Sequence, residues 1–229
     1  MTPTFAPTSL DHVALWVDDR GPLATFLCEQ LGMHAIEETE TFTLVGIDAK
    51  LGKLTLFDAE GPRQRGALER IVLRVGELEP VLAGLPFDTM RQSDGVAAFD
   101  GPAGVPLGLV EAPGEQFDLD HVVLSLSDPA AAARGLVAMG FERRHDGSLV
   151  VGDRYVRTRR GSPADGDRPL LDHLALLVDD AREVQSEAEG AELEIDDVKD
   201  AKNTFAVFLR GPEGVRVEYV EHKPGFALV

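Results

Sequence analysis

The 229-residue sequence contains a single cysteine and no long apolar run. One cysteine, Cys28, cannot form an intrachain disulfide, which favours a reducing, cytoplasmic location. No apolar stretch approaches the roughly 18–20 residues that span a bilayer. The first residues also lack the basic and then apolar pattern of a secretory signal. We therefore expect a cytoplasmic protein with no membrane partner.

Basic residues are scarce relative to acidic ones. The chain has 22 Lys and Arg against 40 Asp and Glu, a formal net charge of −18. This charge repels phosphate backbones, so we expect no nucleic-acid partner. The local exception is a cluster of arginines, which predicts either a solvated strand and loop or an anion-binding rim on a substrate cavity. The cluster consists of Arg154, Arg157, Arg159 and Arg160.

The opening segment LDHVALWVDD (10–19) is repeated along the chain. It recurs as LDHVVLSLSD (119–128) and as LDHLALLVDD (171–180), and more weakly as LERIVLRVGE (68–77). The copies at 10–19 and 171–180 share eight of ten positions. Four related units along one chain indicate an internally duplicated fold.

The segments that close the units are repeated as well. GPAGVPLGLVE (101–111) and GPEGVRVEYVE (211–221) match at six of eleven positions. Between opening and closing segments, each unit shows a helical stretch that ends near a glycine, then short strands separated by turn residues. The pattern predicts an α+β fold of four βαβββ units in two halves, residues 1–113 and 114–229.

These repeated units resemble the vicinal oxygen chelate superfamily, which includes glyoxalase I, bleomycin-resistance proteins and extradiol dioxygenases. The resemblance covers nearly the whole chain. It implies that two units form one open, barrel-like curved sheet with helices outside, and that the concave face holds a metal and a substrate cavity. We expect the neighbouring units of each half to pair, which gives one domain over 1–113 and a second over 114–229.

The resemblance places metal ligands at the histidine of an opening strand and at the acid of a closing strand. In the second half these positions hold His121, His173 and Glu218. Two histidines and one carboxylate suit Fe²⁺ and leave coordination positions open; Mn²⁺ and Zn²⁺ are the alternatives. A glyoxalase-type site would draw a further donor from the closing strand of the other unit. The last strand of the third unit offers arginines instead, so the pattern favours the dioxygenase-like arrangement.

The first half is expected to carry a degenerate site. It keeps His12 but has Arg70 at the second histidine position and Gly108 opposite Glu218. We therefore interpret His12 as an ordinary strand residue. The aspartate before each histidine is expected to set a turn or to orient neighbouring groups rather than to bind the metal. These aspartates are Asp11, Asp120 and Asp172.

Parts of the dioxygenase machinery are absent. The resemblance places a tyrosine where this chain has Phe208, and a histidine within 198–204, where the sequence reads VKDAKNT. Phe208, Asn203 and Arg216 are the candidate substrate-binding residues, and Arg216 would neutralise an anionic substrate. Replacements for the missing acid–base groups remain open among Lys199, Lys202, His145 and His222, of which the two histidines are expected on exposed strand ends.

Two classes of function follow from these residues. One is a metal-dependent enzyme that acts on a small substrate through adjacent oxygens, by oxygenation, isomerisation or elimination. The other is a non-catalytic protein that sequesters a small molecule, as bleomycin-resistance proteins do. A remnant interaction domain is the remaining alternative. The resemblance also predicts pairing into a homodimer.

Overall fold

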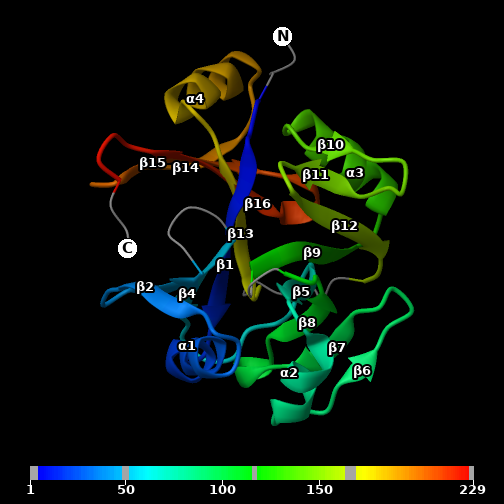
Figure 1. Cartoon of the computed structure of the whole chain (residues 1–229). Coiled ribbons are helices and arrows are strands. Elements are labelled where there is room, and N and C mark those ends of the chain that lie inside the picture. Colours follow the sequence, from blue (N-terminus) through cyan, green and yellow to red (C-terminus); the bar gives the residue numbers. More distant parts are fainter. Residues whose placement is uncertain (1–4, 48–51, 115–117, 163–168, 227–229) are drawn as a thin grey trace.

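The computed structural model describes residues 5–47, 52–114, 118–162 and 169–226, and it contains the four expected βαβββ units (Figure 1). The first unit comprises β1 (Ser9–Val17), α1 (Arg20–Glu29), β2 (His34–Glu38), β3 (Phe42–Gly46) and β4 (Lys53–Asp58). The second comprises β5 (Leu68–Val75), α2 (Leu78–Gly84), β6 (Met90–Arg91), β7 (Ala97–Asp100) and β8 (Pro106–Glu111). The third comprises β9 (Asp118–Leu126), α3 (Pro129–Ala138), β10 (Glu142–Arg143), β11 (Leu149–Val151) and β12 (Arg154–Arg160). The fourth comprises β13 (Leu171–Leu177), α4 (Ala181–Gly190), β14 (Ile195–Asp200), β15 (Thr204–Arg210) and β16 (Arg216–His222).

The end of the repeated opening segment has a structural role as a helix cap. The side chain of Asp19 accepts a hydrogen bond from the amide of Gly21 at the start of α1. Asp128 caps α3 and Asp180 caps α4 in the same way. A carboxylate at this position satisfies an amide that lacks a partner within the helix. The repeated aspartate therefore begins the helix in the first, third and fourth units, whereas Glu77 precedes α2 in the second unit without a side-chain cap.

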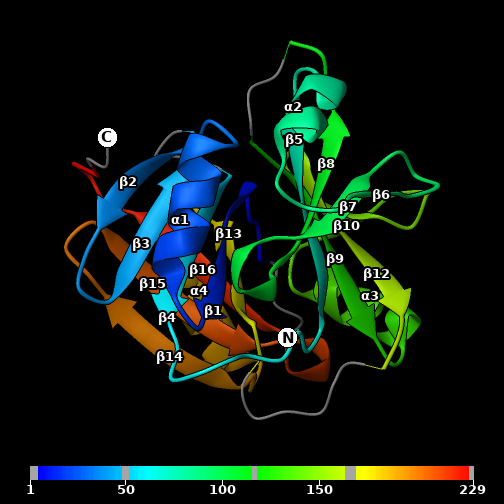
Figure 2. The ribbon, with the colours of Figure 1, turned by 90° about the horizontal axis from the view of Figure 1, so that it is seen from below.

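The units pair differently from our expectation. One eight-stranded sheet has the order β14-β15-β16-β13-β1-β4-β3-β2, and the other the order β10-β11-β12-β9-β5-β8-β7-β6. The first unit thus pairs with the fourth and the second with the third, and the two sheets stand side by side (Figure 2). The expected pairing of neighbours within each half is wrong, and the sheets do not follow the division between residues 113 and 114. Strand periodicity determines which face of a strand is buried, but not which opening strand lies beside it.

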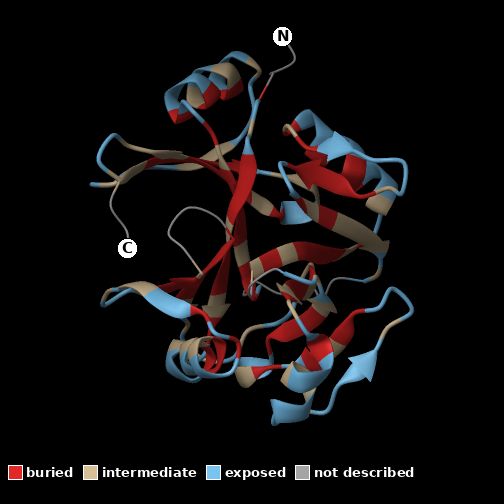
Figure 3. Cartoon of the chain, in the orientation of Figure 1, coloured by how far each residue is buried: buried red, intermediate tan, exposed pale blue. Residues whose placement is uncertain are grey.

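Burial is concentrated in the strands at the centre of each sheet (Figure 3). Residues of both sheets, among them Leu15, Leu56, Leu73 and Leu124, belong to one continuous apolar core. The helices lie outside the sheets, where α3 contacts β12 and α4 contacts β15. In the part of the chain that the structure describes, no helix is long and apolar enough to cross a membrane.

Candidate metal centre

Two histidines meet where β1 and β13 pair at the middle of the first sheet. The antiparallel register places His12 opposite Ala175 and His173 opposite Ala14. The two imidazoles are therefore diagonal neighbours on one face of the sheet. Their Nε2 atoms lie 3.1 Å apart.

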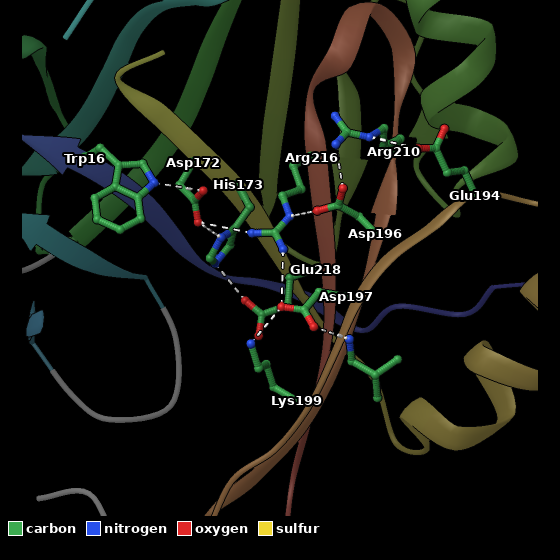
Figure 4. Close-up of polar contacts among 11 residues, drawn as sticks. Trp16, Asp172, His173, Glu194, Asp196, Asp197, Lys199, Arg210, Arg216 and Glu218 are labelled. Carbon is green, nitrogen blue, oxygen red and sulfur yellow. Dashed lines mark hydrogen bonds and ion pairs between the residues drawn. The ribbon is translucent and has the colours of Figure 1, made fainter. Parts of the chain in front are cut away.

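Glu218 completes a group of three donors. It lies on β16, which runs parallel to β13 and places Glu218 beside Ala175. Its Oε2 atom lies 2.8 Å from Nε2 of His173 and 3.2 Å from Nε2 of His12. The contact with His173 is drawn in Figure 4. One atom from each of the three side chains lies within 4.8 Å of the others, so the group could hold a metal ion.

Each histidine is oriented by the aspartate that precedes it. Nδ1 of His12 lies 2.7 Å from Asp11, and Nδ1 of His173 lies 2.7 Å from Asp172. These contacts leave both Nε2 atoms directed at Glu218, as for histidines that bind metals. The expectation that the aspartates orient neighbouring groups is confirmed at these two positions.

The two aspartates are themselves held by different neighbours. Asp11 accepts from Nζ of Lys53 at 2.9 Å and lies 3.2 Å from Nε2 of His222. Asp172 accepts from Nε1 of Trp16 at 3.0 Å and from Arg216 at 3.5 Å. These four neighbours are hydrogen-bond donors, and such contacts favour the ionised form of each aspartate beside its histidine.

Burial and charge act against each other within the group of three donors. Burial alone would lower the pKa of His12, but its contacts with Asp11 and Glu218 raise this pKa to about 9. The pKa of His173 is also raised, against burial, chiefly by the charge of Glu218. Burial would raise the pKa of Glu218, but the charge of His173 and the contact with His12 lower it to about 2. The buried carboxylate therefore requires nearby positive charge, which either protonated imidazoles or a metal cation can supply.

The donor separations fit a metal ion. With bonds of about 2.1 Å, two ligands at right angles are about 3.0 Å apart, and two tetrahedral ligands are about 3.4 Å apart. The observed separations are 2.8, 3.1 and 3.2 Å. They are close to these values, so His12, His173 and Glu218 would hold one ion together and leave it accessible to further ligands.

Thr55 occupies the position at which a fourth protein donor would stand. On the β1 side of the sheet, Thr55 lies beside Ala14, just as Glu218 lies beside Ala175 on the β13 side. Thr55 is buried, and its neutral hydroxyl is a much weaker ligand than a carboxylate. The group therefore has three strong donors rather than the four of a glyoxalase-type site.

The predicted ligand His121 is not part of this group. It lies on β9 in the other sheet, where Nδ1 is 2.6 Å from Asp120 and the ring stacks on Tyr155 at 4.4 Å. The predicted set needs one correction, because His12 takes the place given to His121. The exchange follows from the pairing of the first unit with the fourth.

Arg216 is engaged by acidic side chains of the protein. It lies 2.6 Å from Asp196, 3.5 Å from Asp172 and 3.8 Å from Asp197 (Figure 4). Its guanidinium also lies 4.1 Å from the ring centroid of Phe208. These contacts make Arg216 a support for Asp172. Arg216 also lines the cavity around the three donors, and its role toward an anionic substrate stays a prediction. Phe208 lies edge-on to His173 at 5.2 Å and contributes no hydroxyl.

Of the open acid–base candidates, two line the cavity around the three donors. His222 and Lys199 are lining residues, and Lys199 lies 2.8 Å from Asp197. Lys202 and His145 are exposed and do not line it. Asn203, predicted to bind substrate, is not a lining residue either.

The cavity has a volume of about 540 Å³ and is built by the first and fourth units. It holds the three donors and gathers aromatic rings that are far apart in the sequence. These rings belong to Trp16, Phe42, Phe57, Phe208 and Phe226. Phe208 was the ring that the sequence pattern singled out, because the others become neighbours only through the pairing of the units.

Comparisons with known proteins agree with this architecture. The chain is similar in structure to a candidate dioxygenase from Bacillus subtilis, with a TM-score of 0.78, 19% identity and coverage of 97% of this chain and 87% of that one. Glyoxalase I from Zea mays gives a TM-score of 0.73, 14% identity and coverage of 93% and 92%. The cppA protein of Streptococcus pneumoniae gives a TM-score of 0.66, 16% identity and coverage of 95% of this chain and 100% of that one. A search of curated proteins finds no match. The model of the Glyoxalase/Bleomycin resistance protein/Dioxygenase superfamily matches residues 9–219, and the chain belongs to this superfamily.

Proposed function

We propose that the protein is a metal-dependent enzyme that acts on a small oxygenated substrate bound through adjacent oxygens. The observation that carries the proposal is the meeting of His12, His173 and Glu218 at one point of a 540 Å³ cavity. A metal held by only three protein donors would have room for two substrate oxygens. The donor set suits Fe²⁺ best, with Mn²⁺ and Zn²⁺ as alternatives.

A bound divalent ion would supply Lewis acidity toward the substrate oxygens and, if it is iron, access to oxygen chemistry. The protein supplies the rest. Asp11 and Asp172 hold the two imidazoles in one tautomer, with Nδ1 protonated and Nε2 free to bind. The rings of Phe208 and Phe57 cover the apolar part of the substrate and exclude water.

His222 is the candidate for proton transfer. It lines the cavity, and its ring stacks on Phe226 at 3.9 Å. Its Nε2 atom lies 3.2 Å from Asp11, whose other oxygen holds His12. An imidazole so placed can take a proton from a bound hydroxyl and hold the charge against Asp11. Lys199 is the second candidate, at a greater cost because Asp197 already engages it.

The experiment that tests the proposal measures metal content and turnover together. Protein stripped of metal and reloaded separately with Fe²⁺, Mn²⁺ or Zn²⁺ is assayed with catechols, with and without oxygen, and with thiol adducts of 2-oxoaldehydes. We expect one metal per chain and turnover with a single metal. A chain that binds no metal would refute the proposal. A Glu218→Gln variant with full metal content and full activity would refute it equally.

A second candidate function is sequestration of a small molecule without turnover. The five aromatic rings that line the cavity favour it, since stacked rings bind flat ligands without a metal. The two functions differ in their metal requirement. Calorimetry on metal-free protein that shows tight binding of an aromatic ligand, unchanged by Glu218→Gln, would support sequestration over catalysis.

A further inference from the structure

The second sheet repeats the geometry of the metal centre with different side chains. Where β5 and β9 pair, Val72 lies opposite His121 and Arg70 lies opposite Val123. This is the same diagonal that brings the two metal-binding histidines together in the first sheet. The irregularities in pairing also fall at corresponding places in β1 and β5. Arg70 and His121 are thus paired by the fold in the way that His12 and His173 are.

The position that Glu218 occupies in the first sheet has no acidic residue in the second sheet. The strands that flank β5 and β9 carry Gly108 beside Val72 and Arg157 beside Val123, at the positions that hold Thr55 or Glu218 in the other sheet. A Cβ atom at position 108 would lie 2.8 Å from Cδ of Arg70, so the glycine leaves space for the arginine side chain. The second sheet therefore has arginine side chains around the place where the first sheet has the carboxylate of Glu218.

Two nitrogens at this place have no partner within the described residues. Nη1 of Arg70 and Nε2 of His121 are buried and accept or donate no hydrogen bond there. His121 is 2% exposed, and its Nδ1 atom lies 2.6 Å from Asp120, which leaves Nε2 as the nitrogen without a partner. Arg70 is half-buried, but its Nη1 atom is buried, and a buried polar atom without a partner is costly. A ligand with oxygen atoms would satisfy both groups.

The neighbouring charges do not satisfy Arg70. Arg74 lies 3.4 Å from Asp120 and therefore balances the carboxylate that holds His121. Asp94 lies 3.0 Å from Arg159 and 3.6 Å from Arg157. Glu69, which precedes Arg70 in the sequence, pairs with Arg159, and Asp100 pairs with Arg65. Nη1 of Arg70 has no hydrogen-bond partner within the described residues.

We propose that the second sheet carries a binding site for a small oxyanion, a carboxylate or a phosphate, held between Arg70 and His121. A guanidinium binds two oxygens of such a group in parallel. The imidazole adds a bond through Nε2, as a donor when protonated or as an acceptor from an acidic hydroxyl when neutral. A cavity of about 270 Å³ opens beside the guanidinium; Arg65 and Gln92 also line it, as do the acids Glu69, Asp88 and Asp100.

This site is independent of the proposed metal chemistry, so its test can fail separately. The full-length chain is titrated with sodium phosphate and, in a second series, with sodium acetate, each against sodium chloride at the same ionic strength. Thermal unfolding and calorimetry are measured for the wild type, Arg70→Gln and the matched variant His12→Gln. We expect a saturable rise in melting temperature in wild type and His12→Gln, and at least tenfold weaker binding in Arg70→Gln. The anion that binds more tightly identifies the class of ligand.

The proposal is overturned if neither anion binds saturably, or if Arg70→Gln binds as tightly as the wild type. Should Arg70→Gln fail to fold, nitrogen NMR of the wild type replaces it. Anion binding should shift the side-chain signals of His121 and Arg70 during the titration, and unchanged signals for both would overturn the proposal.

Discussion

The exchange of His12 for His121 as a metal ligand leads to a decisive pair of variants. His12→Gln removes an imidazole whose Nε2 atom lies 3.2 Å from Glu218. His121→Gln removes an imidazole of the second sheet. Loss of groups that merely orient ligands weakens metal binding by about 10–100-fold, so loss of a ligand should cost at least about 100-fold. We expect that loss in His12→Gln, and metal affinity within about threefold of wild type in His121→Gln.

The size of the effect on unfolding follows from mass action. Metal at 100 times its dissociation constant stabilises the folded chain by about 2.7 kcal/mol. In a chain of this length, 1 kcal/mol shifts the melting temperature by about 2–4 °C, so the wild type should gain about 5–11 °C. After a 100-fold loss of affinity the same metal concentration contributes about 0.4 kcal/mol, or roughly 1–2 °C.

The assay is thermal unfolding with and without metal, accompanied by elemental analysis of the dialysed protein. His12→Gln keeps the ion pair of Asp11 with Lys53, so its metal-free form should still fold. The reasoning is refuted if His121→Gln loses the metal-dependent gain while His12→Gln keeps it. Equal retention by both variants would refute it as well.

Three further outcomes are expected. Thr55→Glu adds a fourth donor, the second carboxylate, so metal binding should tighten by roughly tenfold while turnover falls, as measured by calorimetry and steady-state assay. The metal-free protein should be most stable between pH 4.5 and 6.5, the ordinary pKa values of Glu218 and His12. Its stability should fall as the pH rises through about 9, where His12 loses its proton. It should also fall as the pH drops through about 2, where Glu218 gains a proton. Urea unfolding measured across this pH range tests both limits. Arg216→Met removes the cation that lies among Asp172, Asp196 and Asp197. It should lower the free energy of unfolding, measured in urea, by about 1–2 kcal/mol.

Each of these three outcomes has a control. Thr55→Val changes shape little and adds no donor, so it should leave metal affinity unchanged; a tightening in Thr55→Val would contradict the assignment of a fourth position. A pH profile that does not change in His12→Gln would show that another group titrates. Arg210→Met is the matched control for Arg216→Met, because Arg210 also pairs with Asp196 but is exposed.

The sequence predicts the units of this fold well and their partners poorly. Repeated LDH segments and GPxG closures indicate four βαβββ units, and the structure confirms them. Pairing depends on contacts between whole units, which the period of a strand does not encode. The match of eight in ten positions between 10–19 and 171–180 was the available signal, because these two segments form β1 and β13, which pair.

The candidate site was predicted in two of its three donors. His173 and Glu218 both belong to the fourth unit, so they lie close together whichever unit pairs with it. The third donor comes from the unit that pairs with the fourth. Pairing with the third unit, its neighbour in the chain, predicts His121, whereas the observed pairing with the first unit provides His12. The lining of the cavity was hidden for the same reason, since Trp16 and Phe208 come from different units.

The joining of the first and fourth units also affects how the protein folds during synthesis. His12 leaves the ribosome before its partner His173, which follows 161 positions later, and Glu218 follows later still. The first unit must therefore wait, with one edge of β1 unpaired, while the second and third units can assemble with each other. All three donors can capture the metal only after β16 has been made and the fourth unit has joined the first, so a loaded ion would mark the assembly of these two units.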